Sequence, residues 1–228
     1  MGRCATILSM GRGEQAVLYV FFLGLATGVT ILAMSAYLSV SPAWLRRLLL
    51  ASGVLVAGRY VVMTLCAIGL DPRTWWLPRL CWFATSVGLT LPGAVALDQL
   101  VRHPAMTPKK LLRWYAPFFA ASCVALLLGR STVVSDPIAG ARPLLVGWAL
   151  GLFGCAQGAF VLSFLGLSVL LMMKLKSWHI RRALGVLVAA YACLGVFTCG
   201  RWPVELFLFS EILTLLAIWF ALNSASRN

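Results

Sequence analysis

Seven long apolar stretches occupy most of this 228-residue sequence. A helix of about 20 apolar residues crosses the hydrocarbon core of a bilayer and satisfies its own backbone hydrogen bonds there. The stretches lack the alternation of polar and apolar residues that is typical of barrel strands. We therefore expect an all-α fold, in which residues 1–228 form one transmembrane domain, a polytopic bundle of seven helices. These helices are expected near residues 15–38, 44–67, 79–101, 111–129, 144–173, 180–200 and 203–222.

Composition supports the membrane class and argues against nucleic acid as a partner. Hydrophobic residues make up 61% of the chain, and the formal net charge is +13. In a soluble protein such a charge would suggest nucleic-acid binding, but here the cations lie at the ends of the apolar stretches. We expect them to set the topology and to attract anionic lipid headgroups, so that the bilayer itself is the first partner.

Lysine and arginine are distributed unevenly between alternate loops. Cytoplasmic loops of membrane proteins carry an excess of these residues. We therefore expect the amino terminus outside and the carboxyl terminus in the cytoplasm. The richer side contains Arg46, Arg47, Arg102, Lys109, Lys110, Arg113, Lys174, Lys176, Arg181, Arg182 and Arg227; the other side contains Arg3, Arg12, Arg73, Arg79, Arg130, Arg142 and Arg201.

The sequence contains no motif that specifies a reaction. The connections are short, so any ligand is expected within the bundle, at a short loop or on a partner. The two histidines, His103 and His179, lie at helix ends, which does not support haem ligation inside the bundle. No metal-binding or nucleophile-elbow motif occurs, and we expect neither a catalytic residue, nor a metal, nor a cofactor. The Arg-, Ala-, Leu- and Gly-rich composition is compatible with a bacterial inner membrane.

Two charged residues, Arg59 and Glu211, fall deep within apolar stretches. The helical rise places Arg59 roughly 18 Å above Arg47, and Glu211 roughly 12 Å below Pro203. These depths nearly coincide in a core about 30 Å thick. An unpaired charge there costs at least about 2.5 to 3.5 kcal/mol, so we expect the two side chains to pair. The pair is either a structural clamp or a polar centre that binds a small ligand or changes protonation.

Other polar residues are secondary candidates for the same centre. Asp98 lies four residues before Arg102, and an ion pair between these two side chains within one helix is sufficient to explain an acidic residue at this position. Glu205 is within reach of Arg201 or Arg79 near the outer surface. Ser210 and Thr214 lie one helical turn apart, so their hydroxyls either face the centre or bond back to their own helix.

Two groups of glycines have the spacing of closely packed membrane helices. The first group is Gly24 and Gly28, and the second is Gly147, Gly151, Gly154 and Gly158, which share one helix face. We expect the second face to pack tightly against a neighbour. That neighbour is another helix of this chain or a separate subunit, including a second copy in a homo-oligomer.

The layout resembles the seven-helix membrane sensor region of bacterial histidine kinases and diguanylate cyclases. Arg79-Leu80-Cys81-Trp82 opens the third stretch, and Met172-Met173-Lys174-Leu175-Lys176 ends the fifth, before Arg181-Arg182. The resemblance implies a non-enzymatic, sensor-like or accessory subunit. Since no output domain follows within these residues, it would signal through a separate partner protein.

Two alternatives remain at this stage. The sequence contains a weak internal repeat: Phe22-Leu23-Gly24-Leu25 precedes Arg46-Arg47, and Phe164-Leu165-Gly166-Leu167 precedes Arg181-Arg182. This layout is similar to that of sugar transporters built from two three-helix repeats and a linker helix. That resemblance implies a small-solute transporter, although the prolines expected in its first and fifth helices are lacking. Pro203-Val204-Glu205 is similar to the Pro-x-Glu motif of membrane carotenoid cyclases, which would imply an enzyme.

Overall fold

The computed structural model describes residues 12–69, 77–101, 107–136, 140–199 and 204–226. Within them the chain forms seven helices and one antiparallel hairpin. The helices are α2 (Arg12–Tyr37), α3 (Ala43–Ala67), α4 (Leu77–Val101), α5 (Pro108–Leu128), α6 (Trp148–Lys174), α7 (Trp178–Cys199) and α8 (Val204–Ser226); the strands are β1 (Arg130–Asp136) and β2 (Gly140–Val146). Every apolar stretch in the sequence thus corresponds to one helix, with limits that differ by a few residues.

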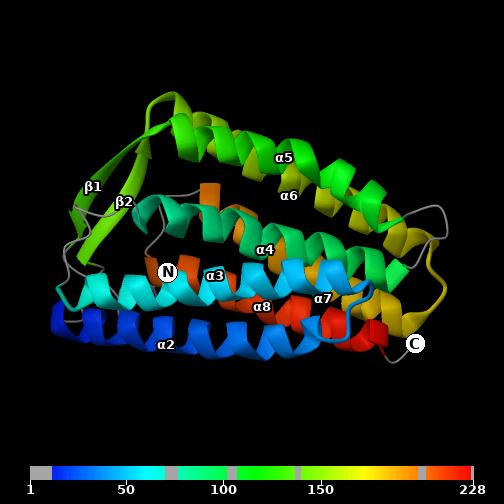
Figure 1. The fold of residues 1–228 in the computed structure, drawn as a ribbon. Helices are drawn as coiled ribbons and strands as arrows, with labels where there is room; N and C mark the ends of the chain where they lie inside the picture. Colours follow the sequence, from blue (N-terminus) through cyan, green and yellow to red (C-terminus); the bar gives the residue numbers. More distant parts are fainter. Residues whose placement is uncertain (1–11, 70–76, 102–106, 137–139, 200–203, 227–228) are drawn as a thin grey trace, which may run out of the picture.

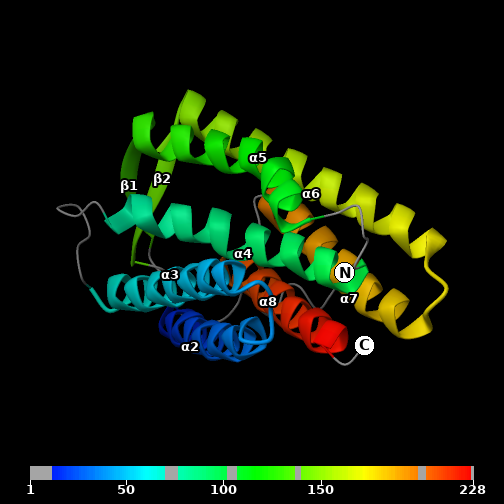
Figure 2. The same cartoon turned by 45° about the vertical axis from the view of Figure 1, so that its right-hand side comes forward.

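The helices lie side by side along one direction, with α4 at the centre (Figures 1 and 2). Each helix packs against the next in sequence, and α8 closes the bundle by packing against α2. Helix α4 also contacts α6, α7 and α8. Helix α2 begins at the end of the bundle that carries the hairpin, and α8 finishes at the opposite end (Figure 1).

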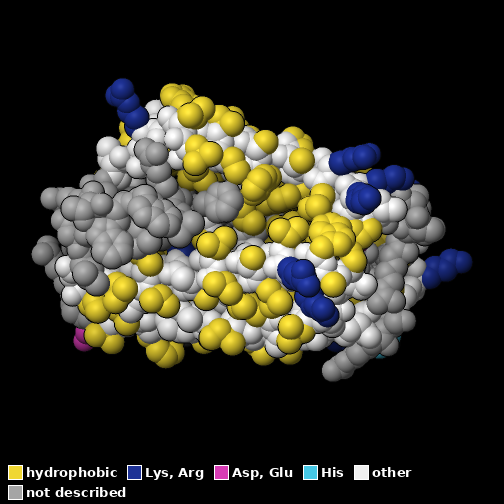
Figure 3. Space-filling view, viewed as in Figure 1, with side chains coloured by type: hydrophobic (Ala, Val, Ile, Leu, Met, Phe, Trp, Pro, Cys, Tyr) yellow, Lys and Arg dark blue, Asp and Glu magenta, His cyan; other side chains and the backbone are white. Residues whose placement is uncertain are grey.

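The outer surface of the bundle is that of a membrane protein. Six helices are long and apolar enough to cross a membrane, and the part of α4 with described side chains, Ser86–Val101, is a shorter apolar helix. Apolar side chains cover the middle of the bundle, as Figure 3 shows. Many large ones project outward, among them Phe21, Ile31, Leu127, Leu162 and Met173. Water does not favour such a surface, whereas lipid does.

The hairpin corrects the predicted start of the fifth helix. We expected helix from residue 144, but Leu144, Leu145 and Val146 belong to β2 and pair with residues of β1. A short run of apolar residues fits a strand as well as a helix, so its pattern alone does not decide. Leu145 is buried in a small cluster with residues of α5 and α6, and this tertiary packing favours the strand. Among the described residues, this hairpin is therefore the one departure from the expected all-α fold.

Gly147 accordingly lies outside the helix to which its spacing assigned it. It is the residue before α6 and has a φ of 64°, a conformation that favours glycine. The chain turns there from β2 into the helix. Its role is conformational rather than one of helix packing.

The remaining glycines of the predicted packing faces contact no other helix among the described residues, so of the two neighbours left open, a helix of this chain is not found there. A methyl group added at Gly24, Gly28, Gly151, Gly154 or Gly158 would meet nothing within 4 Å. The spacing identified a shared face, but the large side chains decide which face is buried. On α6 the buried face carries Phe153, Phe160 and Phe164, which turns the glycines away from the core.

Different glycines permit close approach inside the bundle. At Gly53 and Gly88, the site of an added Cβ is already occupied by side chains of α2 and α3 respectively, and at Gly93 by the ring of Tyr191 on α7. Gly88 and Gly93 both lie on α4, the central helix. These positions lack the four-residue repeat, so the sequence pattern did not single them out.

Candidate functional site

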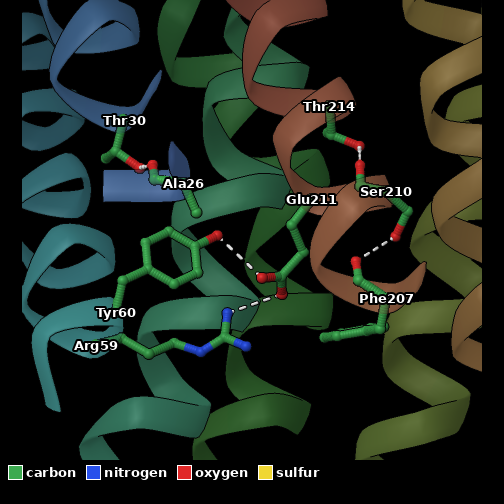
Figure 4. A network of polar contacts seen from close by, with 8 residues as sticks. All are labelled: Ala26, Thr30, Arg59, Tyr60, Phe207, Ser210, Glu211 and Thr214. Atoms are coloured by element: carbon green, nitrogen blue, oxygen red, sulfur yellow. Dashed lines mark hydrogen bonds and ion pairs between the residues drawn. The ribbon is translucent and has the colours of Figure 1, made fainter. Parts of the chain in front are cut away.

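Arg59 and Glu211 form a buried ion pair in the interior of the bundle (Figure 4). Arg59 is on α3 and its Nη1 donates to Oε1 of Glu211 on α8, at 2.8 Å. Only 7% of the Arg59 side chain and none of the Glu211 side chain is exposed. The structure thus brings together the two residues whose depths matched in the sequence. In a medium of low dielectric constant, such a pair requires good geometry and further hydrogen bonds to offset the loss of hydration.

Tyr60 supplies one of those further hydrogen bonds. Its hydroxyl donates to Oε2 of Glu211 at 2.9 Å, so both carboxylate oxygens accept a hydrogen bond. The Arg59 guanidinium carbon lies 5.3 Å from the centre of the Tyr60 ring, within cation–π range. No role for Tyr60 was predicted from the sequence, where its position next to Arg59 was the one available signal. We call Arg59, Tyr60 and Glu211 the polar centre.

The hydroxyls near the polar centre bond to their own helices. Ser210 donates to the Phe207 carbonyl at 2.7 Å, and Thr214 donates to the Ser210 carbonyl at 2.8 Å. Figure 4 shows the Ser210 hydroxyl on the side of α8 away from the Glu211 carboxylate. The sequence left open whether the Ser210 and Thr214 hydroxyls face the polar centre or bond to their own helix. In the structure they bond to their own helix.

The other secondary candidates are not joined to this centre by any described contact. Asp98 lies half-buried in the last turn of α4, and its expected partner Arg102 is outside the described residues. Arg79 and Glu205 lie in the first turns of α4 and α8, and their side chains are also outside the described part of the structure.

A second polar network joins α4, α5 and α6. The Gln157 amide nitrogen on α6 donates to Ser86 Oγ at 2.7 Å and to Ser122 Oγ at 3.2 Å. One turn along α4 from Ser86, Thr90 shares a hydrogen bond of 2.7 Å with the Tyr115 hydroxyl of α5. This network was not predicted from the sequence. The signal that could have found it is an amide in the middle of an otherwise apolar stretch.

The Gln157 network is expected to hold the α5–α6 pair on α4. Replacing Gln157 with leucine removes two interhelical hydrogen bonds and should destabilise the fold by about 1–3 kcal/mol, given the usual worth of such bonds in membrane proteins. Thermal unfolding of the purified protein measures this loss. Leu162→Ala is the matched control, because Leu162 lies on the same helix and is 73% exposed. Equal melting temperatures for the Gln157 variant and the native chain would contradict the assigned role.

The polar centre is closed and electrically balanced. One positive and one negative charge face each other, and the three side chains have almost no exposed surface. This arrangement ties α3 to α8, and in the conformation described it offers no open approach for a solute.

Comparison with protein-family models, curated proteins and solved structures found no match to this chain.

Proposed function

We propose that this chain is a non-enzymatic integral membrane protein that acts through a partner, as a sensor-like or accessory subunit. It crosses the bacterial inner membrane seven times, with the amino terminus outside and the carboxyl terminus in the cytoplasm. The observation that carries the proposal is the outward glycine face of α6, which has the chemistry of a helix contact but no neighbour among the described residues of this chain.

The glycine face consists of Gly151, Gly154 and Gly158. A Cβ added at each of these positions meets open space. Lipid tails gain little from contact with glycine, whereas a second helix can approach a glycine face closely and gain van der Waals contact. The exposed leucines Leu150 and Leu162 lie one turn or less beyond the glycines and would enlarge such a contact. Another membrane protein or a second copy of this chain fits this face.

The closed polar centre favours the same reading. A transporter requires its substrate site to open to at least one side of the membrane, whereas Glu211 and Tyr60 are fully buried. An accessory subunit needs a stable bundle and an outer contact surface. The buried ion pair between α3 and α8 supports the first requirement, and the glycine face of α6 supports the second.

The orientation follows from charge. Lysine and arginine side chains gather toward one end of the bundle (Figure 3), where α4 is followed by α5 and α6 by α7. Exposed cations at this end include Arg47, Lys109, Lys110, Arg113, Lys174, Lys176, Arg181 and Arg182. By the positive-inside rule this is the cytoplasmic end. The resemblance to kinase and cyclase sensor regions has the same orientation.

The proposal is tested by purifying the chain in mild detergent and identifying what accompanies it by mass spectrometry. We expect a stable complex with another membrane protein or a second copy. Gly154→Leu should reduce the complexed fraction at least tenfold and leave the melting temperature of the remaining monomer unchanged, because the added side chain displaces the neighbour by several ångströms, whereas a Cβ at this position meets no described atom of the chain within 4 Å.

The matched control for this experiment is Ala120→Leu, an equally small-to-large change on the exposed surface of α5. It should leave the complex intact. A chain that is monomeric in mild detergent with no companion, and that moves a solute when reconstituted alone into liposomes, would contradict the accessory role and favour a transporter.

A further inference from the structure

The connection between α6 and α7 carries a dense group of cations. Helix α6 ends at Lys174, and α7 begins at Trp178 after a short connection. The exposed cations within residues 174–182 are Lys174, Lys176, Arg181 and Arg182. Helices α6 and α7 contain no acidic residue, and none of these cations is in an ion pair among the described residues. We call residues 174–182 the basic turn; the anions that balance its charge come from outside these two helices.

Described contacts fix how the two ends of the basic turn meet. The Arg181 amide donates to the Ser177 carbonyl at 3.0 Å, which closes the first turn of α7. Just inside the bundle, Met172 Cε lies 3.6 Å from the site of an added Cβ on Gly185. The end of α6 and the start of α7 therefore lie side by side, at the end of the bundle opposite the hairpin (Figure 1). The cations of both helices share one surface.

Arg182 is held over an aromatic ring. Its guanidinium carbon lies 5.9 Å from the centre of the Trp178 ring, and 63% of Trp178 is exposed. Tryptophan is typical of the membrane–water interface, where lipid headgroups lie. A guanidinium held over a ring still directs N–H groups outward, and their planar arrangement matches two oxygens of a phosphate. The basic turn thus presents a phosphate-binding group at headgroup depth.

An apolar surface continues from the cations along both helices. Val186 lies one helical turn from Arg182 on the same face of α7. The exposed apolar side chains next to the basic turn are Leu170 and Met173 on α6, and Val186 and Ala189 on α7. A ligand with an anionic headgroup and hydrocarbon chains matches both surfaces, whereas a soluble anion matches the cations alone.

We propose that one anionic phospholipid binds at the basic turn, with its phosphate at Arg181 and Arg182 and its acyl chains along the apolar side chains beneath them. This is a discrete site, in addition to the general attraction of cationic loops for anionic headgroups. The other pair of adjacent arginines differs, because Arg46 donates to the Leu38 carbonyl at 3.4 Å. The proposal rests on insertion of the bundle in a bilayer, and on neither the partner nor the orientation proposed above.

Native mass spectrometry of the purified full chain in detergent tests the site. The chain is titrated separately with phosphatidylglycerol and with phosphatidylcholine of the same acyl chains. We expect one phosphatidylglycerol to bind at least about tenfold more tightly than phosphatidylcholine. Each cation near a membrane surface changes the affinity for anionic lipid about fivefold. The double variant Arg181→Gln, Arg182→Gln should therefore bind phosphatidylglycerol roughly 25-fold more weakly.

The charge-matched control is Arg46→Gln with Arg47→Gln, which removes two positive charges from the same end of the bundle. It should weaken phosphatidylglycerol binding by less than about twofold, because these charges lie on another helix and are screened. An equal loss in the two double variants would overturn the proposal, since it would show general attraction rather than a site. Equal binding of the two lipids would also overturn it. Displacement of phosphatidylglycerol by an equal concentration of glycerol phosphate would overturn it in favour of a soluble anion.

Discussion

Replacing Arg59 with methionine is expected to destabilise the bundle by about 3–5 kcal/mol, because it leaves the buried Glu211 carboxylate without its opposing charge. Tyr60 would then be the remaining described donor to that carboxylate. The melting temperature of the purified protein, followed by the fluorescence of its tryptophans, should fall by roughly 6–20 °C. The yield of monodisperse protein should fall with it.

The double variant distinguishes a lost charge from lost packing. Adding Glu211→Gln to Arg59→Met removes the unpaired charge and keeps an oxygen that accepts from Tyr60. Because a buried pair can be replaced by neutral groups at little cost, most of the lost stability should return. Equal instability of the single and double variants would show that the charge balance of the pair is not what stabilises this region.

Replacing Gly93 with valine is expected to prevent folding or to cost several kcal/mol. The Tyr191 ring lies against the Gly93 backbone where a side chain would stand, and its hydroxyl donates to the Leu89 carbonyl of the same helix. A larger residue forces α4 and α7 apart and breaks that hydrogen bond. Overpacking of a core usually costs about 1–3 kcal/mol, and the buried hydroxyl adds its own penalty. Folded yield and thermal unfolding measure the effect.

Gly154→Val is the matched control on the outer surface, where an added Cβ meets no described atom within 4 Å. The monomer should keep its melting temperature. If Gly93→Val were as stable as the native chain, and Gly154→Val unstable, the assignment of inner and outer glycines would be reversed.

The sequence was sufficient to predict the helices and the Arg59–Glu211 pair. Long apolar stretches specify helices in a membrane, since no other open structure satisfies the backbone there. Counting residues from each end gave the depths of Arg59 and Glu211, because the helical rise is fixed. Neither prediction requires knowledge of which helices are neighbours.

The features that the sequence did not predict all depend on tertiary contacts. The run Leu144, Leu145 and Val146 forms a strand because Leu145 packs against α5 and α6. The glycine spacing on α6 gave the correct face, but the aromatic side chains opposite decide that this face points outward. Tyr60 and Gln157 gain their roles from partners far away in sequence.

The central claim is that this bundle crosses a membrane seven times, and reporter fusions at the two ends test it most directly. One fusion carries an enzyme that is active only outside the cytoplasm, and the other carries a protein that fluoresces only inside it. We expect the enzyme to be active when fused to the amino terminus, and the fluorescent protein to be bright when fused to the carboxyl terminus. Signals that place both ends in the same compartment would contradict this claim, because seven crossings would put the two ends on opposite sides.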